Sequence, residues 1–178
     1  MTGLHLRPLR AGDAAAVARL HAASWRASYR GLLSDEYLDR QVESERAAVW
    51  QARLQQSPRD TQAGVAAVAD DGELLGFAFI HRHEDPQWGT LIENLHAAPG
   101  RHGLGIGRSL LRWVCAQVPP DEPLHLLVYD ANTAARGFYE RLGGRPQARM
   151  DEIAPDGRPA VVWRYVWPAA SVLAQALG

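Results

Sequence analysis

Glycine recurs at every second position in one short stretch, at Gly103, Gly105 and Gly107. The residues before it, Leu91 to Ala97, have the apolar content of a strand, and those after it carry apolar side chains at helical spacing. The first N–H groups of a helix have no partner within the helix, and glycine lets an anion come close to the backbone. The stretch therefore predicts a phosphate-binding loop at the N-terminus of a helix.

Asn132 and Tyr139 form a second pair of chemically useful side chains, in a segment that reads as a helix and ends in Gly143-Gly144. Seven residues are nearly two helical turns, so the two side chains share a face and lie about 10 Å apart along the axis. An amide at one end and a phenol at the other suit an extended ligand. The alternative is that Asn132 only caps the helix and Tyr139 only packs in the core.

The glycine stretch departs from two common phosphate-binding patterns. The Walker pattern ends in Gly-Lys-Ser/Thr, and this chain contains no lysine. The dinucleotide fingerprint Gly-x-Gly-x-x-Gly would need a glycine where Arg108 stands. A glycine-rich turn that merely joins a strand to a helix is the alternative to a phosphate site.

The stretch HGLGIG resembles the acetyl-coenzyme A (acetyl-CoA) loop of the GNAT N-acetyltransferases, Gln/Arg-x-x-Gly-x-Gly/Ala. His102, Gly105 and Gly107 occupy the motif positions. His102 replaces the usual Gln or Arg, although Arg101 beside it could supply the charge.

The segment NTAARGFYERLGG resembles the other motif of the family, Asn-x-x-Ala-x-x-x-Tyr-x-x-x-Gly. It matches at Asn132, Ala135, Tyr139 and Gly143, at the customary distance after the glycine loop. The resemblance covers most of the chain, from Leu4 to Trp167, and is sharpest between Glu93 and Gly144.

The resemblance implies a single domain over residues 1–178 with the mixed α/β GNAT acyl-CoA N-acyltransferase fold. In that fold a central, mostly antiparallel sheet is flanked by helices, and its fourth and fifth strands splay apart in a V that holds CoA. Here those strands would be Leu91 to Ala97 and Leu124 to Tyr129. The segment HAASWRASYRGLLSDEYLDRQ resembles the helix-loop-helix entry that forms one wall of the acceptor pocket.

The resemblance also implies roles for individual residues. A backbone N–H near Leu95 or His96 would polarise the thioester carbonyl, and Tyr139 would protonate the departing thiolate. Trp25, Arg26 and Tyr29 would line the acceptor wall, although Trp25 and Tyr29 are as readily explained as core residues. Glu93 would also contact the acceptor. The residues expected to bind acetyl-CoA are Leu95, His96, Ala97, Arg101, His102, Gly103, Leu104, Gly105, Ile106, Gly107, Arg108, Asn132, Arg136 and Tyr139.

A general base is needed because a primary amine titrates near pH 10.4, so its deprotonation at pH 7 costs about 4.6 kcal/mol. We favour Glu93, since it lies on the strand where family members often carry a base. The alternatives are His96, His81 and His83, whose rings titrate close to neutral pH. Glu93 could instead be a strand-end carboxylate bonded to an arginine.

The expected activity is acetyl transfer from acetyl-CoA to a primary amine of a small molecule or a peptide N-terminus, by direct attack in a ternary complex. The alternative is a non-catalytic module that senses acyl-CoA. Acidic side chains with aromatic neighbours suit a cationic acceptor through charge pairing and cation–π contact. The residues of this kind in the segments expected to vary are Trp25, Tyr29, Glu84, Asp85, Trp88, Asp151 and Glu152.

No metal is expected, because His81 and His83 share a strand face but have no obvious third ligand, and members of the family use none. A homodimer could form through the terminal strands, with Trp163 and Trp167 either at the interface or in the core. The lone Cys115 allows no intramolecular disulfide.

The composition of the chain limits the classes of partner that can be expected. A formal net charge of −1 and the lack of a basic run argue against a nucleic-acid partner. No apolar segment reaches membrane-spanning length, and the first residues do not resemble a signal peptide, so a cytoplasmic protein without a membrane partner is expected.

The elements that must position these residues can be outlined from patterns. Strands are expected at 4–9, 65–69, 74–80, 91–97 and 124–129, with a hairpin turn at 70–72 and two further strands at the end of the chain. Helices should begin near Gly12-Asp13, near Ser34 or Ser44, after the glycine loop, and at Asn132. Pro119-Pro120 should end the third of these helices, and the strand 124–129 should be covered on both faces.

Overall fold

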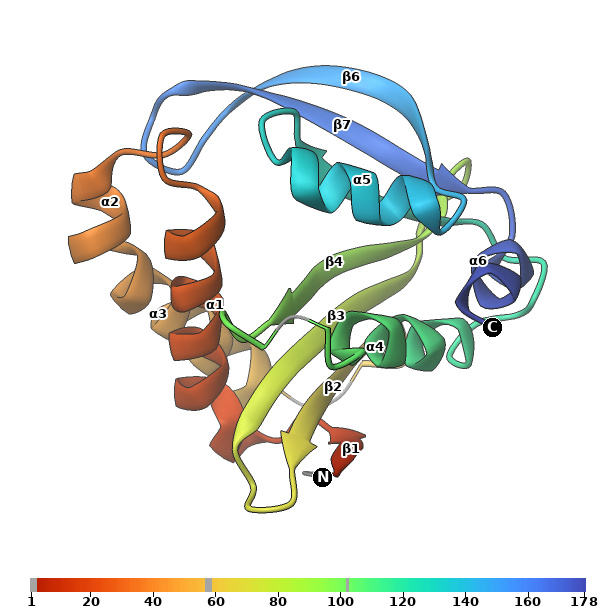
Figure 1. Ribbon diagram of the computed structural model, residues 1–178, viewed down its shortest axis with the longest axis horizontal. Coiled ribbons are helices and arrows are strands. Elements are labelled where there is room, and N and C mark those ends of the chain that lie inside the picture. Colours follow the sequence, from red (N-terminus) through yellow and green to blue (C-terminus); the bar gives the residue numbers. More distant parts are fainter. Residues whose placement is uncertain (1–2, 57–58, 102) are drawn as a thin grey trace.

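Seven strands form one sheet in the order β1-β2-β3-β4-β5-β7-β6 (Figure 1). The computed structural model describes residues 3–56, 59–101 and 103–178. The strands are β1 (Leu4–Pro8), β2 (Gln62–Ala69), β3 (Leu74–Asp85), β4 (Gly89–Ala97), β5 (Leu124–Tyr129), β6 (Arg145–Ile153) and β7 (Pro159–Trp167). The helices are the 3-10 turn Ala11–Asp13, α1 (Ala14–Ser28), α2 (Asp35–Arg40), α3 (Val42–Gln55), α4 (Ile106–Cys115), α5 (Thr133–Arg141) and α6 (Ala170–Leu177).

The sheet opens between β4 and β5. Among the described strands these are the only parallel neighbours, and they pair at just two positions, Thr90 with Leu124 and Leu91 with His125. From Ile92 onward β4 has no ladder to β5, while β5 stays paired with β7 along its whole length. This confirms the mostly antiparallel sheet with a V-shaped splay between the fourth and fifth strands.

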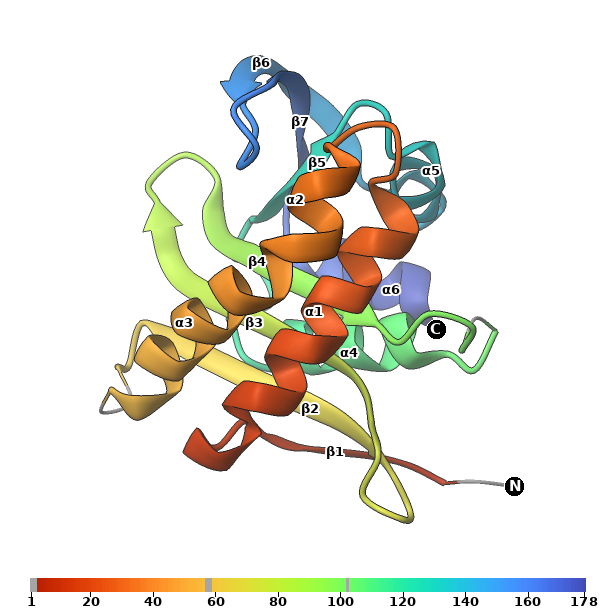
Figure 2. The same ribbon diagram turned by 90° about the vertical axis from the view of Figure 1, so that its left-hand side faces the viewer.

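Helices cover both faces of the sheet (Figures 1 and 2). α1 and α3 pack on one face, where Val17, Trp50, Phe77 and Phe79 are buried together. On the other face α4, α5 and α6 enclose the main core with β2 to β5 and β7. The open part of the V therefore lies between α1 on one side and α4 and α5 on the other.

Several helix ends follow the expected local chemistry. The Ser34 hydroxyl accepts the N–H of Tyr37 at 3.3 Å and caps α2, whereas Ser44 lies inside α3. Asn132 caps α5 by accepting the N–H of Ala135 at 3.2 Å. Gly143, with φ of +82°, follows α5 in the left-handed conformation that ends many helices.

Four expectations about the elements were wrong in part. α4 ends at Cys115, before the prolines, because the N–H groups of Ala116 and Gln117 bond to the carbonyls three residues back, at Trp113 and Val114. β3 runs on to Asp85 rather than ending at Ile80. β5 is not covered on both faces, since Leu127 is 48% exposed. α6 was not expected at all.

Trp167 lies in the main core and is fully buried. It donates its Nε1–H to the carbonyl oxygen of Leu142 at 2.8 Å. It therefore cannot form the dimer interface that its position near the end of the chain suggested.

Candidate active site

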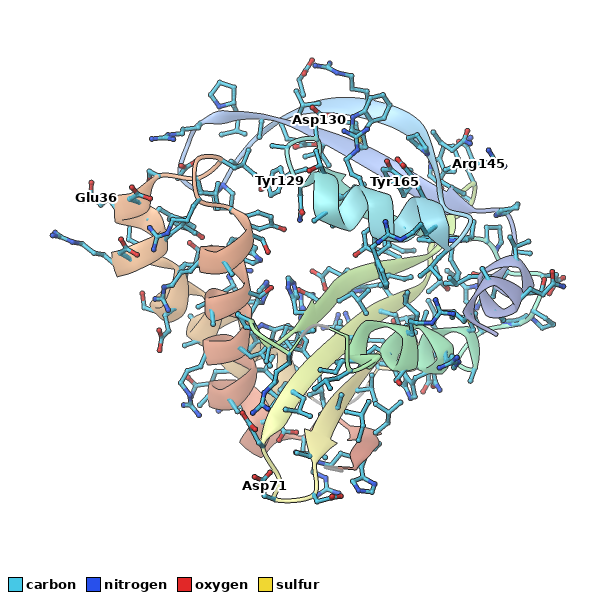
Figure 3. All side chains as sticks on the ribbon, viewed as in Figure 1. Glu36, Asp71, Tyr129, Asp130, Arg145 and Tyr165 are labelled. Atoms are coloured by element: carbon cyan, nitrogen blue, oxygen red, sulfur yellow. The ribbon has the colours of Figure 1, made fainter. Side chains whose placement is uncertain are left out.

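A cleft of about 1240 Å³ occupies the open part of the V. Its floor and sides come from β4, the glycine loop, the start of α4, β5 and α5. α1 and the tip of the β6–β7 hairpin close its far end. Tyr129, at the end of β5, lies near the first turn of α5, above the cleft (Figure 3). The two predicted motifs therefore meet in one cavity.

The glycine loop presents open backbone to this cleft. Gly103 and Gly105 have φ of +83° and +72°, and a Cβ added at either would meet no atom within 4 Å. Gly105 is the N-cap of α4. The loop thus leaves space beside the positive end of a helix, which fits a phosphate.

Gly107 has a different role from the other two glycines. A Cβ at Gly107 would lie 3.3 Å from the Cζ atom of Phe138. The missing side chain therefore allows the first turn of α4 to pack closely against α5, which holds the two motif-bearing helices together.

A β-bulge places Glu93 at the edge of the cleft. Phe79 pairs with Asn94 and the next residue, Ile80, pairs with Ile92, so Glu93 is the extra residue on β4. Bulges re-aim side chains and are common beside active sites.

The Glu93 carboxylate is held by two donors. Arg53 donates its Nη2–H to one oxygen at 2.9 Å, and His81 Nε2 lies 2.8 Å from the other. Arg53 is itself held, with its Cζ 4.8 Å from the ring centre of Trp50 and 4.5 Å from that of Phe79. The carboxylate is one-third exposed and fixed in orientation, and it is bonded to an arginine, as the alternative reading expected.

His96 lies inside the cleft in a protected setting. Its Nδ1 is 3.0 Å from the Ser24 hydroxyl, and its ring centre is 4.3 Å from that of His21. Burial, helped by the charge of Arg46, lowers the pKa of His96 to about 4, so the ring is neutral at pH 7. His21 is neutral for the same main reason, and its Nδ1 accepts the indole N–H of Trp50 at 3.0 Å.

Four aromatic rings line the end of the cleft nearest α1. We call His21, Trp25, Tyr29 and Tyr129 the aromatic wall. Successive ring centres are 5.0, 5.5 and 5.1 Å apart, and all three contacts are edge-to-face. Burial first and Tyr129 second raise the pKa of Tyr29 to about 12. The aromatic wall therefore forms a rigid side of the cleft, made of uncharged rings.

Tyr139 lines the cleft from α5 and is 9% exposed. Its ring packs edge-to-face on Trp167, and its hydroxyl forms no hydrogen bond with any other residue that the structure describes. Burial, with a smaller effect from Tyr29, raises the pKa of this hydroxyl well above its ordinary value. The phenol therefore keeps its proton at neutral pH, as a proton donor must.

Comparison with known proteins identifies the family. The acetyltransferase (GNAT) family model matches residues 18–144, more than half of the chain.

The chain belongs to the GNAT family of acetyltransferases.

Two curated relatives are acetyltransferases. Mycothiol acetyltransferase of Salinispora tropica is 36% identical over 102 residues, which are 54% of this chain and 33% of the relative. Streptothricin acetyltransferase of Streptomyces lavendulae is 36% identical over 101 residues, 53% of either chain. The match thus spans only a third to a half of these relatives.

A solved structure shares the fold. The PaiA N-acetyltransferase of Thermoplasma acidophilum, determined in complex with coenzyme A, superposes with a TM-score of 0.59 and 18% identity. The superposition covers 92% of this chain and 99% of the other. The cleft therefore lies in a fold that this chain shares with a GNAT enzyme determined with coenzyme A bound.

Most residues expected from the GNAT motifs line the cleft. They are Trp25, Tyr29, Glu93, Leu95, His96, Ala97, Arg101, Gly103, Gly105, Ile106, Gly107, Arg108, Asn132 and Tyr139. His102 lies outside the described residues. Leu104 is 58% exposed and does not line the cleft.

Arg136 does not reach the cleft. It pairs with Asp130 at 2.7 Å and donates to the hydroxyl of Tyr165 at 3.2 Å. Its expected contact with acetyl-CoA therefore has no support in this geometry.

Three residues expected near the acceptor also lie elsewhere. Glu84 approaches the buried His125 at 3.3 Å, the Asp85 carboxylate caps the β3–β4 turn, and the ring of Trp88 lies under Arg164. Of the acidic residues expected there, Glu152 does line the cleft.

Some cleft residues were missed. Ser24, Tyr129, Phe138 and Arg141 line it without having been singled out as ligand contacts. Helical spacing could have found Phe138 and Arg141, since they are three residues apart on one face of α5. Tyr129 carried no signal, because its place opposite Tyr29 depends on the tertiary fold.

Within the described ranges, no group of three or more histidine, cysteine, aspartate or glutamate side chains could hold a metal ion. His81 is bonded to Glu93 and His83 to Glu122, so the two rings serve different partners. In the same ranges no helix is long and apolar enough to span a membrane.

Proposed function

We propose that the protein is an acetyl-CoA-dependent N-acetyltransferase that transfers the acetyl group to a primary amine by direct attack in a ternary complex. The observation that carries this is the cleft between β4 and β5, which brings together the glycine loop, the unpaired edge of β4 and the Tyr139 side chain. This grouping supports a site in which a donor, a proton source and an acceptor could meet in one cavity.

The glycine loop and the edge of β4 would orient the donor. The N–H groups at the start of α4 bind the pyrophosphate, and the pantetheine arm extends into the V. A backbone N–H at Leu95 or His96, on the stretch of β4 without a β5 partner, polarises the thioester carbonyl.

Two side chains would move the protons. The amine nitrogen attacks the carbonyl carbon, and Glu93 takes the proton that the amine loses, directly or through a water molecule. When the C–S bond breaks, the Tyr139 hydroxyl gives its proton to the thiolate and is reprotonated from solvent. Arg53 and His81 hold the Glu93 carboxylate in place for this step.

A cationic small-molecule amine is the acceptor that the far end of the cleft favours. Glu152 lines this end and forms no ion pair within the described part of the chain. Tyr29 and Tyr129 of the aromatic wall can receive a cation over their rings. The ring of Trp25 is already covered by Arg46, whose Cζ lies 5.0 Å from the ring centre. The names of the two curated relatives, which refer to mycothiol and streptothricin, support a small-molecule acceptor, and a peptide N-terminus has the same chemistry.

A panel of acceptors tests this proposal. The protein is incubated with acetyl-CoA and with primary amines, amino acids, peptides or anionic acceptors that lack an amine, while free thiol release and product mass are measured. We expect acetylation of cationic primary amines. Binding of acetyl-CoA with turnover of none of the panel would instead identify a sensor, and a preference for the anionic compounds would contradict the acceptor class.

A further inference from the structure

Three arginines line the cleft, and two of them are already engaged. Arg101 pairs with Glu73 at 2.8 Å. Arg108 donates to the carbonyl oxygen of Leu177 at 2.7 Å, at the end of α6. Arg141 lines the same cleft from the last turn of α5 and forms neither an ion pair nor a hydrogen bond with the residues that the structure describes.

The other charged side chains of α5 do not serve Arg141. Arg136 is paired with Asp130, and Glu140 accepts the hydroxyl of Tyr165 at 2.5 Å. A cation on a cleft wall without a protein partner is available to an anionic ligand.

The packing of α5 on α4 places Arg141 near the glycine loop. Phe138 contacts the position of Gly107 in the first turn of α4, as the 3.3 Å approach to a Cβ there indicates. Arg141 follows Phe138 by three residues, so it lies on the same face of α5 about 4.5 Å further along the axis. The side chain turns back along α5, because Nη1 of Arg141 lies 3.3 Å from where a Cβ at Gly137 would be. The guanidinium therefore lies on the cleft wall beside the contact of the two helices, on the side of the proposed pyrophosphate site.

CoA carries two kinds of phosphate group, and this arrangement can bind each of them with different residues. The pyrophosphate is matched by the N–H groups of the glycine loop and of the first turn of α4. The ribose 3′-phosphate is a terminal group with a charge of nearly −2, and it needs a donor of its own. A planar guanidinium with several N–H groups suits such a group.

We propose that Arg141 binds the 3′-phosphate of CoA and thereby makes the cleft select acetyl-CoA over its 3′-dephospho form. The inference rests on the proposed binding of acetyl-CoA in the cleft. It adds a residue that recognises the nucleotide end of the donor, remote from the reacting thioester.

Calorimetric titration with CoA and with 3′-dephospho-CoA tests the assignment, using the wild type, Arg141→Met and Arg145→Met. Arg145 is a matched control, because it is an exposed arginine four residues away that lies at the outer side of the molecule (Figure 3). We expect the wild type and the control to bind CoA about tenfold more tightly than 3′-dephospho-CoA at low salt. Arg141→Met should bind both ligands with the affinity that the wild type has for 3′-dephospho-CoA.

Three results would overturn the assignment, and they differ in what else they affect. Equal binding of the two ligands by the wild type would show that the protein does not recognise the 3′-phosphate, and it would leave the proposed function intact. An equal loss of affinity for both ligands in Arg141→Met would show that Arg141 binds the pyrophosphate instead. Binding of neither ligand by the wild type would refute the proposed function as well.

Discussion

The Tyr139 hydroxyl combines burial with access to the cleft, and this suits a group that gives up a proton only in the transition state. Tyr139→Phe should lower kcat about 100-fold while changing the Kd for acetyl-CoA little, because the ring packing on Trp167 is kept. Steady-state kinetics and calorimetry on the same variant measure the two quantities. An unchanged kcat would assign the proton to water or to another residue.

Glu93 is the second residue whose role can be isolated. Glu93→Gln keeps the size of the side chain and removes its ability to take a proton, so kcat/KM for the amine should fall about 100-fold. Binding of acetyl-CoA should not change. Glu43→Gln, which alters an exposed carboxylate of α3 paired with Arg26, is the control and should behave as the wild type.

An active Glu93→Gln variant would contradict the role of Glu93 as base. Among the alternatives named from sequence, His96 is the one inside the cleft. His81 contacts Glu93 instead, and His83 is bonded to Glu122.

At the residue scale, the sequence predicted what motifs encode and missed what the fold brings together. Asn132 and Tyr139 lie in the cleft as their spacing suggested, yet Arg136, between them, points to Asp130. A helix has several faces, and only packing decides which one borders the cavity. The bulge at Glu93 and the contact of Tyr29 with Tyr129 depend on strand register and tertiary packing, which no local pattern reveals.

The glycine loop is the element whose chemistry can be tested apart from the fold. Gly105→Asn places a side chain in the open space beside the N-terminus of α4, while asparagine accepts the left-handed backbone better than most residues. We expect the Kd for acetyl-CoA to rise roughly tenfold or more through crowding of the pyrophosphate. Calorimetry measures the affinity, and thermal unfolding reports any loss of stability.

Gly72→Asn provides the matched control for the loop. Gly72 has φ of +87°, has open space around its Cβ position and lies in the β2–β3 turn, away from the cleft. Gly72→Asn should lower the free energy of unfolding about as much as Gly105→Asn does, and it should leave the Kd for acetyl-CoA unchanged. Normal binding by Gly105→Asn would place the phosphate site elsewhere.

At the element scale, the order of strands and helices followed from hydrophobic periodicity and turn residues. α6 escaped because it is a short segment of small and apolar residues, whose periodicity is hard to distinguish from a loop. It is fixed by packing Ala170, Leu173 and Leu177 into the main core. Leu127 on β5 is exposed because its face of the strand opens into the V, and the splay of the sheet cannot be seen in the local pattern.

For the whole molecule, the buried neutral histidines make stability depend on pH. The pKa of His96 is about 4 in the fold and 6.5 ordinarily, so the unfolded chain binds more protons between these values and stability falls as pH drops through this window. The titration of His96 alone should lower the free energy of unfolding by about 2 kcal/mol between pH 7 and pH 5. His21, whose pKa is also lowered, acts in the same direction.

Urea unfolding at pH 7 and pH 5 measures this loss in the free energy of unfolding. His96→Gln should remove that share of the decline, because glutamine does not titrate. If the variant and the wild type lost the same stability over this interval, the ring of His96 would not be shielded as the structure describes.

The claim on which the account rests is that the cleft between β4 and β5 binds acetyl-CoA. Calorimetric titration of the purified protein with acetyl-CoA tests this most directly. The account predicts saturable binding of one acetyl-CoA per chain, weakened in Gly105→Asn and kept in Gly72→Asn. The absence of binding at millimolar acetyl-CoA would contradict it.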